Sequence, residues 1–360
     1  MTNTRSLSAT LTPFIKLADP TTYVACSWNL KIDRDALLHW TAFFKRHIRV
    51  IVNLAREMAI ARSQDLNELE SRATALLSEF DAFFDTVVAD IHSFDEVTIL
   101  KLDIWRDGLL RKHGFVDAFV DLKNRENEKM LPLLPIVCAQ IDALPTEADQ
   151  LRAIIEGIFA GNIFDMGAEA TANAFTHGSP DFFATRASLS PRPWLFDDYE
   201  ALATRLLEGP RHKKAVFFID NAGSDFLLGA IPLTRWLARR GTQVIITANE
   251  RPTLNDMTIH DVNAWWDRIL IAEPSLAALP ITRVTSGTGE PLIDLLGVSS
   301  ELNTAAVDAD LVILEGMGRG VESNLDAQFN CDALNLAMIK DIAVANRHSG
   351  KLYDCVCRFR

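Results

Sequence analysis

Apolar residues in the first half of the chain recur at helical spacing. Between residues 35 and about 169 they form stripes such as Leu37, Trp40, Phe43, Phe44 and His47, followed by Ala73, Leu77, Phe80, Phe83 and Phe84. A period of three to four residues is typical of amphipathic helices. Aromatic stripes of this kind are most simply explained as packing between helices. The first half is therefore predicted to be helical.

The period changes after residue 190. Short, nearly continuous apolar runs at 214–219, 242–248 and 310–314 predict strands that are buried on both faces. Helices are predicted over 225–240, closed by Gly241, and over 331–346, with a final edge strand over 351–359. The stretch 176–194, with Pro180, Pro191 and Pro193, predicts a connecting loop or lid.

Strands that alternate with helices imply right-handed crossovers and a parallel sheet covered by helices. The predicted fold class is α/β: a Rossmann-like α/β/α sandwich with a mainly parallel sheet, plus a helical N-terminal part. A length of 360 residues corresponds to about two domains at roughly 150 residues each. We expect a helical part at 1–190 and a metal-binding Rossmann-like part at 191–360, or both joined in one integrated domain.

The composition of the chain limits the classes of partner that the protein is expected to bind. Asp and Glu number 48 against 36 Lys and Arg, a net charge of −12, which argues against nucleic-acid or anionic-membrane binding. A small phosphorylated ligand needs only a few focused cations. Five scattered cysteines, no long apolar run and no apolar stretch after the first residues predict a soluble cytoplasmic protein. Oligomeric state has no signal in the sequence.

Polar, small-residue segments follow three of the predicted strands. These segments are 220–225, 249–256 and 315–319. The carboxyl ends of parallel strands meet at one edge of a sheet, where ligands of open α/β folds bind. One such segment would be an ordinary turn, but three that all carry carboxylates or amides favour a functional site.

The residue types in these segments indicate metal-assisted phosphate chemistry. Asp220, Asn221 and Asp256 offer hard oxygen ligands, which Mg²⁺ and Mn²⁺ prefer. Arg319, and Lys340 on the predicted following helix, supply positive charge. Gly316 and Gly318 would let backbone N–H groups approach an anion. A metal and cations around a phosphate are what phosphoryl transfer requires.

Other signals are weaker. The chain has no GxxxxGK[ST] loop, so a P-loop kinase is not predicted. The lone Gly-x-Gly-x-Gly at 316–320 follows a late strand and does not indicate dinucleotide binding. Cys355 and Cys357 are expected to be buried on one face of a strand, and the basic cluster at 211–214 to be solvated.

Several ordered segments resemble the damage-control phosphatase family, formerly domain of unknown function 89. They are FIDNAGSD at 218–225, NERPTLND at 249–256 and EGMGR at 315–319. EGMGR marks the subfamily that includes the phosphatase domain of type four pantothenate kinase proteins. Further segments that resemble the family lie at 18–30, 114–128 and 161–168, and toward the C-terminus.

The resemblance implies roles for particular residues. Asp220, Asn221 and Asp256 would hold a divalent metal, whether Mn²⁺, Mg²⁺, Co²⁺ or Ni²⁺. The substrate pocket would be lined by Asn162, Asp225, Glu315, Gly316, Met317, Gly318, Arg319 and Lys340, with Asp165 as a further candidate. The sequence departs from the family at Asn335, where lysine is frequent, and at Arg251, where a smaller residue is frequent.

The resemblance also implies a reaction. Asp220, Asp256 and Lys340 are the expected catalytic residues, and the nucleophile is either Asp220 or a water on the metal. The implied substrate is a phosphate monoester, 4′-phosphopantetheine or its oxidised or damaged derivatives. Sugar phosphates, which other branches of the family use, and a non-catalytic binder of phosphorylated metabolites stay open as alternatives. A methyltransferase is not favoured by the hard-ligand segments.

Overall fold

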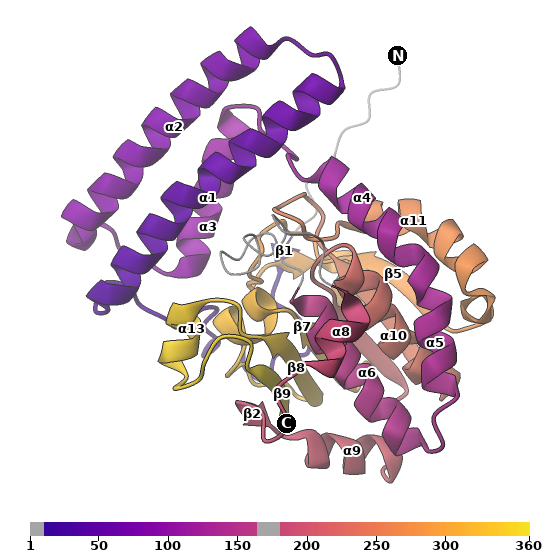
Figure 1. Ribbon diagram of the computed structural model, residues 1–360. Helices are drawn as coiled ribbons and strands as arrows, with labels where there is room; N and C mark the ends of the chain where they lie inside the picture. Colours follow the sequence, from indigo (N-terminus) through magenta and orange to yellow (C-terminus); the bar gives the residue numbers. More distant parts are fainter. Residues whose placement is uncertain (1–10, 164–180) are drawn as a thin grey trace.

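The computed structural model describes residues 11–163 and 181–360 (Figure 1). Asp165, and the first part of the predicted loop at 176–194, lie outside the described residues. The helical first half begins with two long antiparallel helices that project to one side in Figure 1. Its helices are α1 (Arg34–Ala61), α2 (Leu66–Ala89), α3 (Ile99–Lys112), α4 (Val120–Met130), α5 (Leu134–Asp142) and α6 (Glu147–Asn162).

Side-chain caps fix where four of these helices begin. The side chains of Asp33, Asp65, Thr98 and Thr146 each accept a hydrogen bond from a backbone N–H in the first turn of α1, α2, α3 and α6. Such caps satisfy donors that have no partner within the helix. Between the caps, apolar residues at helical spacing face the core, so the prediction of a helical first half is confirmed.

A seven-stranded, mostly parallel sheet forms the second half, with strand order β2-β9-β8-β7-β3-β4-β5. Only β9 pairs antiparallel within it, against β8, and the predicted fold class is confirmed. The strands are β2 (Phe196–Asp197), β3 (Lys214–Phe218), β4 (Gln243–Ala248), β5 (Ile281–Thr285), β7 (Leu311–Glu315), β8 (Asp332–Met338) and β9 (Cys355–Phe359). A separate pair joins β1 (Leu11–Thr12) to β6 (Val298–Ser299).

Alternate residues of each strand enter different cores. Phe217 packs in the core beneath α5, α6, α10 and α11, whereas Phe218 packs on the opposite face against residues near α12. Toward β8 and β9, that opposite face packs against α1, α2, α3 and α13. The second-half helices are α8 (Phe182–Ala187), α9 (Tyr199–Leu207), α10 (Ile231–Arg239), α11 (Ile259–Ala272), α12 (Ser300–Ala305) and α13 (Ile342–Arg347).

The helix predicted over 331–346 is wrong. Residues Asp332–Met338 form the strand β8, and only Ile342–Arg347 are helical. Leu334 and Leu336 face one core while Ala337 faces the other, an alternation of period two that is typical of a strand buried on both sides. Leucine, alanine and methionine are strong helix formers, but burial between two cores overrides their propensity.

Two smaller predictions also need correction. The strand β9 is not at the edge of the sheet, because the two-residue strand β2 pairs outside it. Within the predicted loop, residues Phe182–Ala187 form the helix α8. The prediction for Cys355 and Cys357 is confirmed, since both are buried in the same core. In the basic cluster, His212 is buried against Asp332, while Arg211 and Lys213 are exposed.

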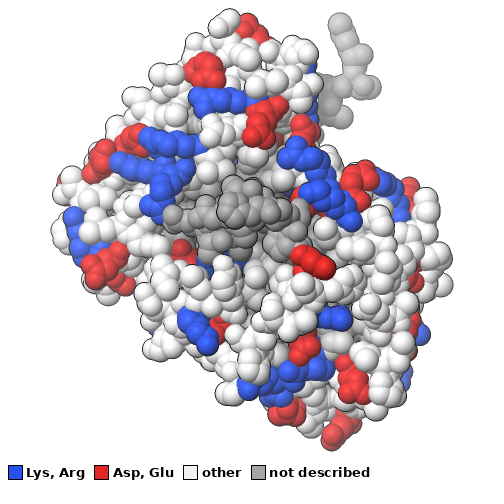
Figure 2. Space-filling model, in the orientation of Figure 1, with Lys and Arg blue, Asp and Glu red and all other residues white. Residues whose placement is uncertain are grey.

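Two further observations concern the partners that the protein could bind. No helix within the described ranges has the length and apolarity that a bilayer crossing requires. On the face shown in Figure 2, basic and acidic side chains are interspersed.

Candidate active site

The strand ends meet as predicted. Asp220 and Asn221 follow β3, Glu315 ends β7, and Asp256 lies in the loop after β4. Asn221 and Asp256 form an isolated antiparallel bridge, and the backbone N–H of Met257 donates to the carbonyl of Asp220 over 2.9 Å. Backbone pairing therefore fixes these loops against each other at one edge of the sheet.

Arg319 joins two of the predicted metal ligands. The residue is 1% exposed and lies in a π-helical turn, η5 (Gly318–Ser323), separated by two residues from β7. One guanidinium nitrogen donates to Asp256 Oδ2 over 2.7 Å and the other forms a short hydrogen bond to Asp220 Oδ1. A planar guanidinium suits such paired carboxylates. This pair of acids thus already accommodates a cation.

Asn162 organises a second group of acids. It ends α6, and its Nδ2 donates to Asp225 Oδ2 over 3.0 Å and to Glu315 Oε1 over 3.2 Å, with Asp220 Oδ2 at 3.4 Å. Its Oδ1 accepts from the backbone N–H of Met338 over 3.1 Å. The helical half thereby contributes directly to the sheet-edge site, as the resemblance implied for Asn162.

Burial dominates the electrostatics of these acids. It raises the pKa of Asp220 well above its ordinary value, against the opposing charges of Arg319 and Lys340. Burial likewise raises the pKa of Glu315, reinforced by the charge of Asp225 and by a hydrogen bond with it. For Arg319, burial opposes the charge, but Asp256 and Asp220 outweigh it and hold the pKa above its usual range.

The donor set suits a divalent cation. Carboxylate oxygens of Asp220, Asp225 and Glu315 lie within 4.8 Å of one another, and all three residues are buried. With Asp256, these are four carboxylates against the two cations Arg319 and Lys340. Fully ionised, they would leave an excess of two buried negative charges, which only bound protons or a cation can offset. Hard oxygen donors favour Mg²⁺ or Mn²⁺ types of ion.

Gly316 acts differently from the prediction. Its backbone N–H donates to the carbonyl of Leu336 over 3.0 Å and so is not directed toward an anion. Its φ is +100°, and a Cβ at this position would overlap the carboxylate of Asp220. Glycine is therefore required so that the chain can pass directly beneath Asp220. At Gly318 a Cβ would lie 2.9 Å from the carbonyl oxygen of Pro291.

Lys340 and Met317 lie beside the acids. Lys340 is 1% exposed and follows the strand β8, whereas the sequence analysis placed it on a helix. Its backbone N–H donates to the sulfur of Met317 over 3.2 Å, and its charge acts on Asp220. Every predicted site residue within the described ranges is thus at or next to this edge of the sheet.

A small pocket opens onto the acids. Its volume is about 70 Å³, and Asp220, Asn221 and Asp256 line it together with Met317 and Gly318. Aromatic residues of α1 form another part of the wall: Trp40, Phe43 and Phe44. The stripe that we interpreted as packing between helices is core and also wall of this pocket.

The sequence analysis missed a second buried cluster in this wall. Arg106 of α3 is 1% exposed and pairs with Asp103 over 2.6 Å and with Asp107 over 2.8 Å. Asp107 also accepts from Thr253 over 2.8 Å, in the loop that carries Asp256. Burial raises the pKa of Asp103 to about 7. An Asp and an Arg three residues apart are usual on the solvent-exposed face of a helix. Their spacing alone therefore did not indicate that this pair is buried.

The segment at 114–128 supports the loop after β3. The side chain of Asn127 accepts from the backbone N–H of Gly223 over 2.7 Å. Gly223 has a φ of +79°, a conformation that favours glycine. Lys123 is 2% exposed and contacts Asp261 over 2.8 Å and Asp117 over 3.2 Å. These contacts join α4 to the N-terminus of α11, beside the loop of Asp256.

Sequence comparisons extend across nearly all of the chain. The profile described as "Damage-control phosphatase ARMT1-like domain" matches residues 44–356. A damage-control phosphatase of Arabidopsis thaliana is 35% identical, over 97% of both chains. Pantothenate kinase 2 of Arabidopsis thaliana is 34% identical over 98% of this chain, and a 4′-phosphopantetheine phosphatase of Mus musculus is 29% identical over 95%.

The chain spans only part of two of these relatives, 42% of the pantothenate kinase and 48% of the mouse phosphatase. Among solved structures, a DUF89 family protein from Pyrococcus horikoshii matches with a TM-score of 0.61 and 18% identity, covering 89% of this chain and 96% of that one. That likeness concerns the fold. Together with the profile match and the full-length relative, it shows that this chain belongs to the ARMT1-like damage-control phosphatase family.

Proposed function

We propose that this protein is a metal-dependent phosphatase that hydrolyses the phosphate monoester of a small metabolite. The observation that carries the proposal is the buried group of acids around Arg319 in a chain of this family. Its excess of negative charge fits a divalent cation, and its two buried cations fit the phosphate that such a cation would help to bind.

Two overlapping donor sets could hold the metal, and Asp220 belongs to both. The resemblance favours Asp220 with Asn221 and Asp256, whereas Asp225 and Glu315 offer carboxylate oxygens on the other side of Asp220. When bound, a divalent cation would polarise a phosphate oxygen and lower the pKa of a coordinated water. Mg²⁺, Mn²⁺, Co²⁺ and Ni²⁺ are the candidates.

The surrounding residues orient the acids and balance charge. Asn162 and Asn249 donate to carboxylates and so hold their oxygens in place: Asn249 Nδ2 lies 3.2 Å from Asp256 Oδ2. Arg319 and Lys340 provide fixed positive charge where the phosphoryl group gains negative charge in the transition state. The aromatic residues of α1 exclude water from one side of the pocket and so strengthen these interactions.

Asp220 is the candidate nucleophile if a phosphoenzyme forms. Its carboxylate lines the pocket and is held by Arg319 and by Nδ2 of Asn221, at 2.8 Å. Rapid acid quench with a ³²P-labelled substrate distinguishes the two routes. Label that remains on the protein and disappears in Asp220→Asn would identify an aspartyl-phosphate, and its absence during turnover would identify direct attack by water.

We infer that the substrate is 4′-phosphopantetheine or an oxidised or damaged derivative of it. The support is the likeness to the mouse 4′-phosphopantetheine phosphatase, over 95% of this chain. We further propose that the reaction takes place in the cytoplasm, where the five free cysteines would stay reduced. The helical and α/β parts act as one unit in this proposal, because both line the pocket.

Phosphate release tests the proposal. Purified protein would be assayed with 4′-phosphopantetheine and a panel of sugar phosphates, without metal and with each of Mg²⁺, Mn²⁺, Co²⁺ and Ni²⁺. Metal-dependent release that is lost in Asp220→Ala would support the phosphatase, and the panel would rank the substrates. Ligand-induced stabilisation without release under any metal would instead support a non-catalytic binder.

A further inference from the structure

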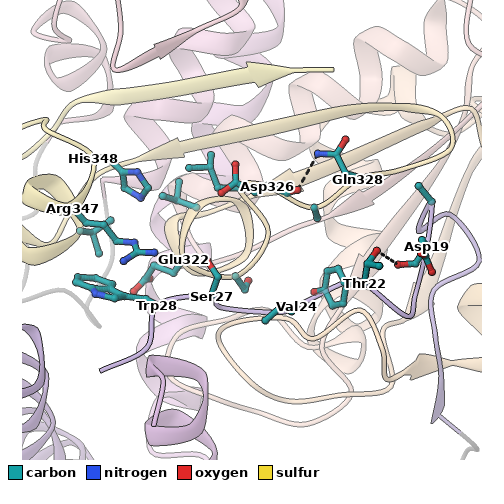
Figure 3. Close-up of a pocket in the computed structure, with 17 residues that line it drawn as sticks. Asp19, Thr22, Val24, Ser27, Trp28, Glu322, Asp326, Gln328, Arg347 and His348 are labelled. Atoms are coloured by element: carbon teal, nitrogen blue, oxygen red, sulfur yellow. Dashed lines mark hydrogen bonds between the residues drawn. The ribbon is translucent and has the colours of Figure 1, made fainter. Parts of the chain in front are cut away.

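A second cavity lies next to the small pocket that Asp220, Asn221 and Asp256 line, which we call the catalytic pocket. It has a volume of about 450 Å³ and opens between the N-terminal segment 18–28, the turn η5 and the helix α13 (Figure 3). In Figure 3, Trp28, Glu322, Arg347 and His348 lie at one end of this cavity and Asp19, Thr22 and Gln328 at the other. Segment 18–30 resembles the family, yet none of its residues lines the catalytic pocket.

The catalytic pocket is too small for a whole elongated metabolite. Its volume is about 70 Å³. Pockets for small molecules typically measure about 300–1,000 Å³. The second cavity falls within that range. A substrate that places its phosphate at the acids must therefore extend beyond the catalytic pocket.

The two cavities are neighbours along three elements. Glu322 of η5 lines both of them. The N-cap of α13, Asp341, lines the catalytic pocket, and Arg347 at the end of the same helix lines the second cavity. Trp40 of the catalytic pocket contacts Trp28 of the second cavity edge to face, with ring centroids 6.4 Å apart. The end marked by Trp28 and Glu322 therefore adjoins the catalytic pocket.

The lining of the second cavity suits a chain of amides and methylene groups. Val24 and Leu325 offer apolar surface, and Ser27, Thr22 and Gln328 offer hydroxyl and amide groups along its length. Arg347 lies over the ring of Trp28, 4.8 Å from its centroid, and provides donors at the near end. Mixed apolar and hydrogen-bonding walls fix the orientation of a ligand without requiring it to be charged.

We propose that the second cavity binds the non-phosphorylated arm of the substrate and so selects elongated amide-containing phosphate monoesters over compact ones. This inference rests on the proposed phosphatase function and adds the residues that set its specificity. The phosphate lies at the acids, the chain passes Glu322 and Trp28, and the distal end lies toward Thr22 and Gln328. Ser27 and Arg347 are the specificity-determining residues on the exposed side of this path.

Filling the cavity provides a direct test. In Ser27→Phe an exposed serine becomes a large side chain within the path of the arm, and in Arg347→Ala the cover over Trp28 is removed. Ser78→Phe is the matched control, because Ser78 is exposed on α2, outside the residues that line either cavity. The measured quantity is the ratio of kcat/KM for 4′-phosphopantetheine to kcat/KM for p-nitrophenyl phosphate.

We expect this ratio to fall at least tenfold in Ser27→Phe, through a rise in KM for 4′-phosphopantetheine, and severalfold in Arg347→Ala, with the wild-type ratio kept in Ser78→Phe. An unchanged ratio in both variants would overturn the inference while leaving the phosphatase intact. If wild-type protein releases no phosphate from either compound, the proposed function fails. Binding of unphosphorylated pantetheine, measured by calorimetry, then tests the role of the second cavity separately. Binding that is lost in Ser27→Phe would support the proposal that this cavity binds the arm, and no binding to the wild-type protein would overturn it.

Discussion

Two arginines with the same chemistry lie in different surroundings. Arg319 and Arg106 are each 1% exposed, and each bridges two aspartates. The acids of Arg106 lie three residues before it and one after it on α3. Those of Arg319 come from two loops, at positions 220 and 256, far from it in the sequence. One cluster is local to a helix, whereas the other is assembled by the sheet.

The difference indicates a division of labour. A local cluster is fully formed once α3 folds, and its contact with Thr253 joins the helix to the loop of Asp256. The sheet-edge cluster gathers four buried acids from separate elements, and carboxylate oxygens of Asp220, Asp225 and Glu315 lie within 4.8 Å of one another. Both acids of the other cluster pair with Arg106 itself. Carboxylate oxygens that converge in this way can hold a divalent cation. We therefore assign binding and catalysis to the cluster of Arg319 and positioning to the cluster of Arg106.

The largest expected effect comes from exchanging one acid in each cluster. Asp220→Asn should lower kcat by about 10³-fold or more, because a group that contacts the transferred phosphoryl charge is lost. Asp103→Asn should keep kcat within about tenfold, as expected for an indirect role. Phosphate release from 4′-phosphopantetheine measures both, with circular dichroism as the control for folding. Equal losses in the two variants would contradict the division of labour.

Removing Arg106 should affect stability before chemistry. Arg106→Met leaves Asp103 and Asp107 buried without their cation, which costs about 3–5 kcal/mol of unfolding free energy. Urea unfolding measures this loss. Because positioning is indirect, kcat of the protein that remains folded should fall less than in Arg319→Met. A stability equal to that of wild type would show that the cluster of Arg106 does not hold α3 against the loop of Asp256.

Replacing two glycines in turn distinguishes the close approach of the chain to Asp220 from the strain of a left-handed backbone. Gly316 and Gly241 both have positive φ, +100° and +94°, but a Cβ would overlap Asp220 only at position 316. Gly241→Ala should cost about 1–2 kcal/mol from the left-handed backbone alone and leave kcat unchanged. Gly316→Ala should lose most activity as well, because the carboxylate of Asp220 must move. Similar activities in the two variants would contradict this explanation of Gly316.

The smallest expected effect concerns pH. Burial raises the pKa of Asp103 to about 7, so the folded protein retains a proton that the unfolded chain releases above its ordinary pKa of 3.8. The contribution of Asp103 to the free energy of unfolding is largest below its ordinary pKa of 3.8 and is lost as the pH rises toward 7. Asp103→Asn removes the titration, so Tm should fall by a few degrees less between pH 5 and pH 8 than in wild type. An identical fall in both proteins would argue against a buried, protonated Asp103.

Much of the sheet edge could be predicted from the sequence. The apolar runs that became β3, β4 and β7 are unambiguous, and parallel strands bring their ends together whatever the details of packing. Strand β8 was missed because helix-forming residues such as Leu334 and Ala337 are buried on both faces, which only the tertiary structure determines. The same error placed Lys340 on a helix, whereas it follows the strand β8.

The wall of the pocket could not be predicted in the same way. Trp40 and Phe44 have the spacing of ordinary core residues, and nothing local distinguishes the part that lines a cavity from the part that packs. Arg106 and Asp103 have the spacing of a solvated pair, and their burial depends on how α3 packs against the rest of the chain. The spacing of residues predicts whether a segment is a helix or a strand, whereas the burial of a polar group depends on contacts between elements that are distant in the sequence.

Manganese binding tests the central claim most directly. Electron paramagnetic resonance of free Mn²⁺ gives the amount bound to wild-type protein, to Asp220→Asn and to Asp103→Asn. We predict that wild type and Asp103→Asn bind Mn²⁺ with similar affinity, and that Asp220→Asn has lost this binding. Binding that survives in Asp220→Asn but disappears in Asp103→Asn, or no binding by folded wild-type protein, would contradict the assignment of the metal site to the edge of the sheet.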